Sequence, residues 1–206
     1  MTNLPDLTIP PDVAYVGDLA LIRPAYTTRI KEIKDRAEID STLMRNIEML
    51  VNDSFRERGM KIVPDYFSLP LWDSFQYLLI IQDLMKDRDA GVLIAFKPDD
   101  FIVYDKIAVH PGYRGRHFMT KLISAARVID KRMHGQIDAG ARTSDKTVHE
   151  KYRRLSDYSV FVPGHDNKTN YWVHIFNGSN SNGIAPKREK SVSSLIEIPS
   201  TFESLG

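Results

Sequence analysis

Apolar residues gather in short runs separated by charged turns in the middle of the chain. The runs FQYLLIIQD (75–83), GVLIAFK (91–97) and FIVYDKIAV (101–109) have the length and the β-branched and aromatic content of buried strands. Only LMKDRDA and PDD separate them, and connections this short join neighbouring antiparallel strands. The pattern therefore predicts a three-stranded antiparallel meander.

Helical periodicity lies on both sides of this meander. Residues 39–55 repeat apolar positions at helical spacing, and Asp40 is the expected N-cap. Residues 115–131 place a second apolar stripe along one face of a helix. Shorter helices are predicted at 64–72 and 146–155. An edge strand before the first helix and three strands after the meander complete the pattern, at 29–35, 136–142, 158–162 and 170–176. The alternation predicts a mixed α/β (α+β) fold.

Composition adds limits to this picture. The 206 residues suit one domain, and 42% hydrophobic residues can bury a core. A net charge of +1 gives no general attraction to nucleic acid or to an anionic membrane, so neither is an expected partner. The absence of cysteine excludes disulfides, thiolate zinc sites and a cysteine nucleophile. No metal-binding histidine spacing is present, and no metal site is expected.

The two ends differ in composition from the middle. Prolines and a glycine predict an extended arm over residues 1–20, and Gly, Ser and Asn predict a flexible tail over 178–206. Residues 21–177 are the predicted domain. The first residues lack a basic stretch followed by an apolar run, and no segment approaches the roughly 18 apolar residues that span a bilayer. The expected location is the cytoplasm.

The segment HPGYRGRHFMTKLI (110–123) carries the most informative chemistry. It follows the third meander strand and leads into a predicted helix, where backbone N–H groups and the helix dipole can hold an anion. Arg114, Gly115 and Arg116 offer a permissive backbone and two cations at that point. An ordinary strand-to-helix turn with an exposed basic patch is the alternative.

With IAVHPGYRGRHFMTKLI in this position, the sequence resembles the GNAT acetyltransferase superfamily. Its members carry a Val-x-Pro-x-x-Arg-Gly turn, within the pattern Arg/Gln-x-x-Gly-x-Gly/Ala, that binds the pyrophosphate of acetyl-CoA. The stretches VYDKIAV, EIDSTLMRNIEMLVNDSF and GARTSDKTVHEKYRRLSDYSVF, with the final NYWVHIF, are similar to the C-terminal domain of vertebrate-type N-acetylglutamate synthases. The resemblance covers roughly residues 22–177 and implies a mostly antiparallel sheet of about six or seven strands flanked by helices.

The resemblance implies a set of cofactor-binding residues for acetyl-CoA, the expected co-substrate. His117 and Met119 replace two glycines of the superfamily pattern. A side chain disfavours positive φ, and such strain costs on the order of 1–3 kcal/mol, enough to weaken CoA binding. The implied cofactor-binding residues are Ile107, Ala108, Val109, Arg114, Gly115, Arg116, His117, Phe118 and Met119.

The resemblance also implies substrate-binding residues. Lys106 corresponds to a lysine that helps to hold the amino-acid carboxylate; the alternative is a surface lysine paired with Asp105. Gly140 stands where the synthases have their first arginine, while Arg142 matches the second and can reach toward the vacated place. Asp145 replaces an asparagine, and it equally fits a helix N-cap. Either N-acetylglutamate is not the product or the pocket has been rebuilt.

Tyr152 falls where these synthases carry a tyrosine, with a one-residue offset. A tyrosine near the thioester sulfur can protonate the leaving thiolate, and backbone N–H groups near Ile107 to Val109 can polarise the thioester carbonyl. A core tyrosine on an amphipathic helix is the alternative. No general base is assigned, because His110 beside a proline is commonly structural.

Three functions follow as hypotheses. The first is transfer of an acetyl group directly from acetyl-CoA to the amine of an amino acid, with L-glutamate favoured by the resemblance. The second is a degenerate GNAT module with weak or no CoA binding that acts through a partner, such as a separate amino-acid-kinase-like subunit. The third is acetylation of protein or peptide amines. A homo-oligomer is compatible with each of them.

Overall fold

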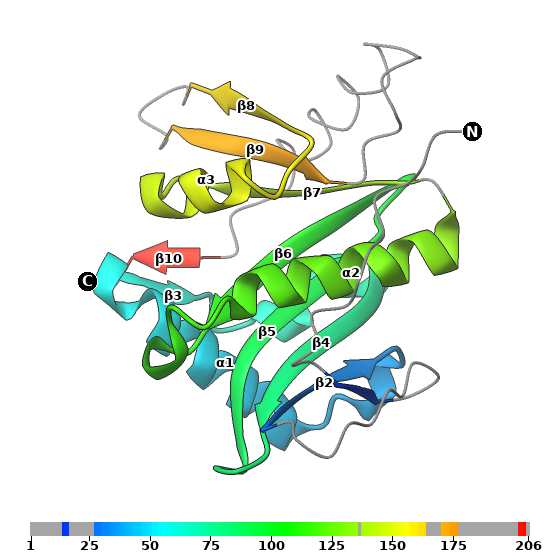
Figure 1. The fold of residues 1–206 in the computed structure, drawn as a ribbon, viewed down its shortest axis with the longest axis vertical. Coiled ribbons are helices and arrows are strands. Elements are labelled where there is room, and N and C mark those ends of the chain that lie inside the picture. Colours follow the sequence, from blue (N-terminus) through cyan, green and yellow to red (C-terminus); the bar gives the residue numbers. More distant parts are fainter. Residues whose placement is uncertain (1–13, 17–26, 136, 164–169, 177–201, 205–206) are drawn as a thin grey trace.

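The computed structural model describes residues 14–16, 27–135, 137–163, 170–176 and 202–204. Most of the strands form one eight-stranded sheet in the order β1-β2-β4-β5-β6-β7-β9-β8, and β3 pairs with β10 in a second, two-stranded sheet (Figure 1). The strands are β1 Ala14–Val16, β2 Thr28–Ile33, β3 Met60–Ile62, β4 Phe75–Asp83, β5 Arg88–Phe96, β6 Phe101–Val109, β7 Asp138–Thr143, β8 Tyr158–Val162, β9 Tyr171–Phe176 and β10 Phe202–Ser204.

The predicted meander is confirmed, since β4, β5 and β6 are neighbours in antiparallel register. The strand predicted at 29–35 is β2, but it is not at the edge of the sheet, because β1 pairs with it in parallel. That pairing places three residues of the predicted arm in the sheet. Three residues of the predicted tail form β10 beside β3. The rest of the predicted tail, residues 178–201 and 205–206, lies outside the described residues.

The main helices are α1 Ser41–Phe55, α2 Phe118–His134 and α3 Lys146–Arg153. Asp40 caps α1 as predicted, because its carboxylate accepts a hydrogen bond from the N–H of Leu43 at 2.8 Å. The predicted start of α2 at residue 115 is wrong: Gly115 (φ 81°) and His117 (φ 58°) have left-handed backbone, which a right-handed helix cannot contain. The helix therefore begins at Phe118.

The helix predicted at 64–72 is also wrong. Two short 3₁₀ helices, η3 Tyr66–Ser68 and η4 Pro70–Ser74, occupy this region. Leu69 between them is extended (ψ 145°), because the ring of Pro70 disfavours helical backbone in the residue before it. Apolar spacing alone does not reveal this break.

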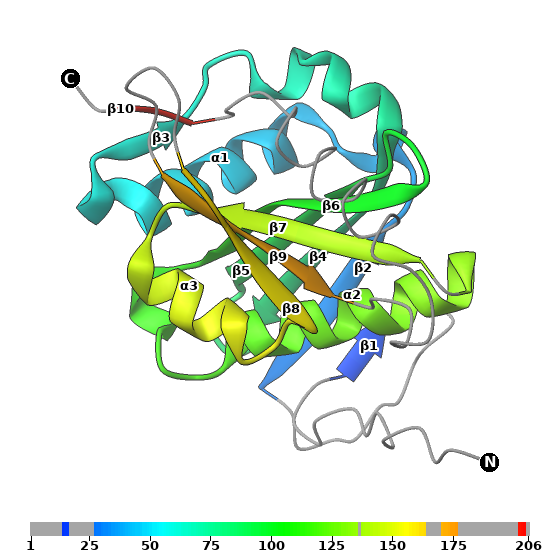
Figure 2. The same ribbon diagram turned by 90° about the horizontal axis from the view of Figure 1, so that it is seen from above.

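Helices α1 and α2 lie on opposite faces of the main sheet (Figure 2), and a hydrophobic core lies on each of these faces. One contains α2 and Tyr152 of α3, and the other contains α1 together with Tyr66 and Trp72. Among the described residues, no helix is both long and apolar enough to cross a membrane. The packing of these helices covers both faces of the sheet, and its backbone groups lack a strand partner where two neighbouring strands separate.

Such a separation exists between β6 and β7. Their parallel pairing covers only Phe101–Val103 against Asp138–Gly140. Immediately afterwards a β-bulge interrupts β6. Ile94 of β5 pairs with Lys106, whereas the next residue, Ala95, pairs with Tyr104, so Asp105 is the extra residue of the bulge. The rest of β6, up to Val109, keeps its partner β5 on one side and has no paired strand among the described residues on the other; this unpaired edge opposite β7 is called the opening below.

A buried carboxyl group joins α2 to the sheet beneath it. Asp130 accepts hydrogen bonds from the hydroxyls of Tyr77 (2.6 Å) and Tyr104 (2.5 Å), and its side chain has no solvent exposure. Burial raises the pKa of Asp130 from 3.8 to about 6. The folded protein therefore holds a proton here that the unfolded chain releases at lower pH.

We predict that the free energy of unfolding falls as the pH rises from about 4 through about 6, by up to roughly 3 kcal/mol from this group. The contribution is present below the unfolded pKa and is lost above the folded one. Urea unfolding of wild type and Asp130→Asn at several pH values isolates it as the difference between the two proteins. A constant difference across this range would contradict the raised pKa.

Candidate functional site

The opening between β6 and β7 presents backbone groups of β6. The N–H of His110 donates to the carbonyl of Ala90 on β5. Because successive residues of a strand direct their N–H and C=O groups to alternate sides, Ala108 also faces β5, whereas Ile107 and Val109 face the opening. The hydroxyl of Ser54 on α1 donates to the carbonyl of Val109 at 2.9 Å on the open side. Two of the three strand residues predicted to contact the cofactor therefore direct N–H groups into the opening.

The loop after β6 is braced by the β4–β5 hairpin. The hydroxyl of Tyr113 donates to Asp83 at 2.8 Å, and the Tyr113 ring stacks on Phe118 at the start of α2. Nδ1 of His110 accepts from the N–H of Gly112, and its Nε2 lies 2.6 Å from Arg88. His110 thus has the structural role that the sequence left open, and the loop has a fixed shape.

The start of α2 offers unpaired N–H groups. Those of Gly115, His117, Phe118 and Met119 have no hydrogen-bond acceptor within the described part of the chain, as expected before and in the first turn of a helix. His117 adopts the left-handed backbone that glycine prefers, whereas Met119 lies inside α2. Only one of the two missing glycines therefore imposes backbone strain.

The two arginines of the loop differ in their contacts. Arg114 is tied to the end of α1, with Nη1 2.5 Å from a carboxylate oxygen of Glu57 and Nη2 donating to the carbonyl of Ser54 at 3.0 Å. Arg116 is exposed and its guanidinium lies 5.4 Å from the centre of the Tyr113 ring. Both arginines adjoin Gly115 in the sequence, just before the start of α2, and cations at such a position suit a diphosphate.

The predicted substrate residues Lys106 and Arg142 converge on the α1 face of the opening. The bulge turns Asp105 and Lys106 to the same side, where the Tyr66 hydroxyl (2.9 Å) and the Lys106 ammonium (2.7 Å) both donate to Asp105. Arg142 of β7 acts electrostatically on both Asp105 and Lys106, and its guanidinium lies 6.0 Å from the Tyr171 ring.

These two cations are not equally accessible. Lys106 pairs with Asp105, as the alternative interpretation of this lysine predicted. It is 0% exposed, however, and is therefore not a surface lysine. Burial lowers the pKa of Lys106 and also that of Arg142. Arg142 keeps partial exposure. A carboxylate that enters the opening on this face meets Arg142 before Lys106.

Tyr152 of α3 belongs to the core of the opposite face. Its ring packs edge-on against His174 (centroids 5.3 Å) and Phe176 (6.1 Å) of β9. The side chain is buried, and its hydroxyl has no hydrogen-bond partner among the described residues. Burial raises the pKa of Tyr152, and the charge of Arg58 opposes that rise. The core position that the sequence offered as the alternative is therefore present, and the catalytic role of Tyr152 stays a prediction.

Asp145 is not part of the Lys106–Arg142 group. It is the N-cap of α3, accepting from the N–H of Val148 at 2.8 Å, and its other oxygen lies 3.0 Å from Nε of Arg58. The helix-cap role that the sequence offered as an alternative is therefore present. Arg58 belongs to η2 (Arg56–Arg58), the short turn that follows α1.

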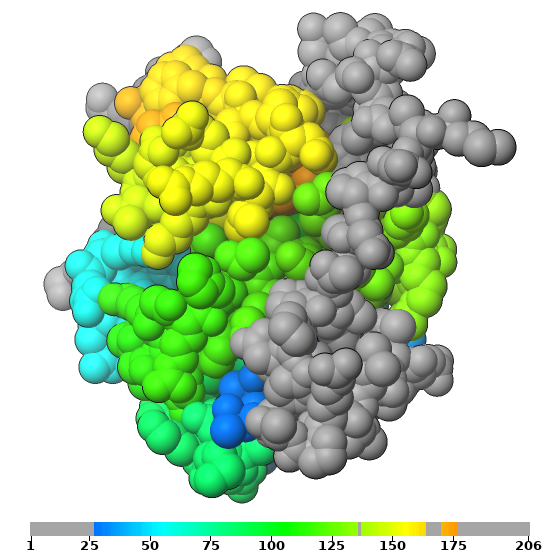
Figure 3. Space-filling model, viewed as in Figure 1, coloured from blue at the N-terminus to red at the C-terminus, as the bar shows by residue number. Residues whose placement is uncertain are grey.

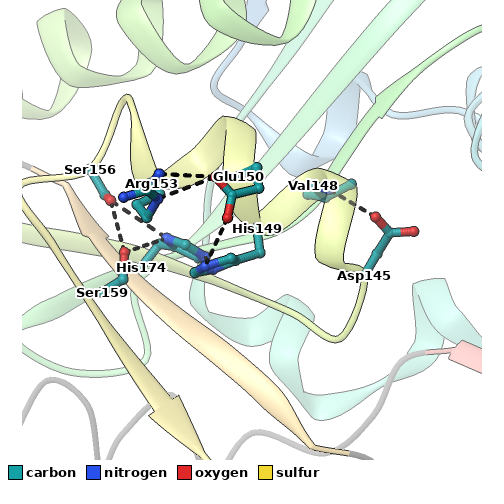
Figure 4. A network of polar contacts seen from close by, with 8 residues as sticks. All are labelled: Asp145, Val148, His149, Glu150, Arg153, Ser156, Ser159 and His174. Carbon is teal, nitrogen blue, oxygen red and sulfur yellow. Dashed lines mark hydrogen bonds and ion pairs between the residues drawn. The ribbon is translucent and has the colours of Figure 1, made fainter.

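A chain of polar contacts that the sequence gave no reason to expect fixes α3 to β9 and β8 (Figure 4). Nε2 of the fully buried His174 lies 3.2 Å from Nδ1 of His149, and Nδ1 of His174 lies 2.9 Å from the hydroxyl of Ser159. His149 also stacks on Trp172, with ring centroids 4.4 Å apart. The only signal in the sequence was a histidine within the apolar run YWVHIF.

Known acetyltransferases share this fold but little of the sequence. No family model and no curated protein matches the chain. Among solved structures, a GNAT-family acetyltransferase of Staphylococcus aureus shares 13% identity, with a TM-score of 0.51 over 71% of this chain and 98% of that one. An acetyltransferase of Streptococcus agalactiae (16%, 0.52, 73% and 99%) and the ribosomal-protein-S18-alanine N-acetyltransferase of Escherichia coli (11%, 0.52, 75% and 98%) are similar to the same extent.

These neighbours establish that the chain has the fold of GNAT acetyltransferases, as the resemblance implied. Figure 3 shows the face on which α3 and β8 (yellow) adjoin the green part of the chain that contains β6 and α2. The candidate site takes residues from both of these parts of the chain. It combines open N–H groups of β6, the start of α2, Tyr152 and the Lys106–Arg142 group.

The two non-glycine positions of the loop should respond oppositely to glycine. We predict that His117→Gly leaves the unfolding free energy unchanged or raises it by up to about 1 kcal/mol, because it relieves left-handed strain. Met119→Gly should lower it by about 1 kcal/mol or more, because glycine is unfavourable inside a helix. Thermal unfolding of the two variants measures both, and a lower stability of His117→Gly than of Met119→Gly would contradict this backbone assignment.

The histidine pair should make the fold sensitive to acid. Burial, and then the neighbouring His149, lower the pKa of His174 from 6.5 to about 4. The stability that this group contributes is therefore present above pH 6.5 and is lost as the pH falls through about 4. NMR titration of the imidazole signals measures the pKa directly, with His174→Gln identifying the His174 signal. Titration of that signal near pH 6.5 would show that the pair is not buried in solution.

Proposed function

We propose that the protein is an acetyl-CoA-dependent N-acetyltransferase that acts on a small amine carrying a carboxylate. L-glutamate is the favoured substrate because of the resemblance to N-acetylglutamate synthases. The observation that carries the proposal is the opening between β6 and β7, which has anion-binding groups at one end and a buried cationic group on one face. The GNAT fold supports the reaction class.

The start of α2 is the proposed site for the diphosphate of CoA. The N–H groups of Gly115, His117, Phe118 and Met119, with Arg114 and Arg116 beside them, supply positive potential there. The thioester arm then lies along β6, where the N–H groups of Ile107 and Val109 donate to its carbonyl oxygen. Such donors stabilise the oxyanion that forms when the carbonyl is attacked.

The acceptor enters from the α1 face. Its carboxylate pairs with Arg142. Lys106, which donates to Asp105 together with the Tyr66 hydroxyl, is more deeply buried than Arg142. The amine nitrogen attacks the thioester carbon and the C–S bond breaks. Tyr152 gives its hydroxyl proton to the thiolate. Solvent takes up the proton that the amine loses and returns a proton to Tyr152. Acetyl donor and acceptor thus meet from opposite faces of the sheet.

Two observations support a second function. His117 has a strained backbone, and Arg114 already pairs with Glu57, so a module that binds CoA weakly and acts through a protein partner is the alternative. Location in the cytoplasm, self-association and a kinase-like partner remain predictions from the sequence. Binding of the cofactor separates the two functions.

We predict that acetyl-CoA raises the melting temperature of the wild-type protein, because a ligand that binds only the folded state stabilises it. Arg142→Ala should raise KM for the amino acid by about tenfold or more with little change in KM for acetyl-CoA, while Tyr152→Phe should lower kcat by about a hundredfold. A thiol-release assay over a panel of amino acids measures these constants. No thermal shift at millimolar acetyl-CoA would leave only the partner module.

A further inference from the structure

The hairpin between β4 and β5 brings two further cations to the loop after β6. Nζ of Lys86 lies 5.5 Å from the centre of the Tyr113 ring, and the guanidinium of Arg116 lies 5.4 Å from the same centre. Nη2 of Arg88, the first residue of β5, lies 2.6 Å from Nε2 of His110. The rings of His110 and Tyr113 are themselves 5.8 Å apart. Lys86, Arg88 and Arg116 therefore lie against two neighbouring rings of the loop that leads to α2.

None of these three cations pairs with a carboxylate in the described part of the chain, and all three are exposed. Two acids of the hairpin have other partners. Asp83 accepts from the Tyr113 hydroxyl and from two backbone N–H groups, and Asp89 accepts from the side chain of Gln82. Asp87 at the tip is exposed and forms no ion pair with the described residues either. A ligand anion can therefore reach the three cations without displacing a carboxylate.

His110 cannot satisfy both of the groups that donate to it. The N–H of Gly112 lies 3.1 Å from Nδ1, and the guanidinium of Arg88 faces Nε2. Burial, and then the charge of Arg88, lower the pKa of His110 from 6.5, so the ring is neutral near pH 7. A neutral imidazole has one N–H donor and one acceptor nitrogen, so one of the two contacts sets donor against donor. Another acceptor beside Arg88 would relieve this conflict.

We infer that Lys86, Arg88 and Arg116 bind the 3′-phosphate of CoA. This inference rests on the proposed function, which places the diphosphate of CoA at the start of α2. The ribose joins the diphosphate to the 3′-phosphate through a few bonds, so the second anion lies near Arg116, the neighbour of Gly115 in the sequence. A phosphate oxygen gives Arg88 the acceptor for which it otherwise competes at His110. Guanidinium groups bind phosphate through paired N–H groups, and lysine adds a point charge.

The site selects free CoA thioesters as acetyl donors. Dephospho-CoA differs from CoA only in lacking the 3′-phosphate, and an acyl group on protein-bound phosphopantetheine lacks it as well. Neither can form the charge-assisted hydrogen bonds to Lys86 and Arg88. Both residues belong to the hairpin rather than to the opening, so the expected signature is in the affinity for the donor and not in the chemical step.

Dephospho-CoA removes one phosphate from the ligand, just as Arg88→Gln removes one cation from the protein. In calorimetric titrations, we predict that wild type binds CoA about tenfold or more tightly than dephospho-CoA. Arg88→Gln and Lys86→Gln should each weaken CoA binding by about threefold or more, while dephospho-CoA binding changes by less than about twofold. Arg45→Gln is the matched control, because Arg45 is equally exposed and unpaired among the described residues but lies in the first half of α1. It should bind both ligands as wild type does.

Nitrogen NMR of the His110 imidazole gives a second readout that does not depend on turnover. CoA should draw Arg88 away and shift the Nε2 signal, whereas dephospho-CoA should leave that signal in place. Arg88→Gln identifies the Nε2 signal and should abolish its response to CoA.

The outcomes separate this inference from the proposed function. Equal affinity of wild type for CoA and dephospho-CoA would refute the 3′-phosphate site and leave the transferase proposal standing. If Arg88→Gln weakens the binding of both ligands by the same factor, Arg88 only braces the loop through His110, and the inference is again wrong. If wild type binds neither ligand at millimolar concentration, the proposed cofactor site and this inference are both wrong.

Discussion

The whole site depends on the point where β6 leaves β7. Three residue pairs hold the two strands together, and the bulge at Asp105 then ends their pairing. An unpaired strand edge inside a sheet exposes N–H groups that require a partner, and burial of such groups without one is costly. The bulge also turns Asp105 and Lys106 to one face. A single extra residue therefore creates both the opening and the charged group beside it.

Three elements close around this opening and are linked at the end of α1. Ser54 contacts Val109, Glu57 pairs with Arg114, and Arg58 pairs with Asp145. The same short stretch thus contacts the strand, the cofactor loop and the helix that carries Tyr152. Movement of this stretch would displace β6, the cofactor loop and α3 together, so the positions of these three parts are physically coupled.

Burial and charge are balanced differently on the two faces. On the α1 face, the buried Lys106 donates to Asp105 and lies over the Tyr66 ring, while burial lowers its pKa. On the α2 face, His174 and Tyr152 are favoured in their neutral forms by burial. An acetyl transfer that delivers a carboxylate to the first face and requires proton donation on the second fits this division.

The sequence by itself determined the meander, the cap at Asp40 and the basic loop, because apolar period and capping chemistry act over a few neighbouring residues. It did not determine the start of α2, where the backbone of His117 decides, nor the break before Pro70. Only the tertiary structure placed Arg142 beside Asp105, His149 against His174 and Arg58 against Asp145. Each of these contacts joins elements far apart in the chain, and their meeting depends on strand order and on the bulge, which no local pattern encodes.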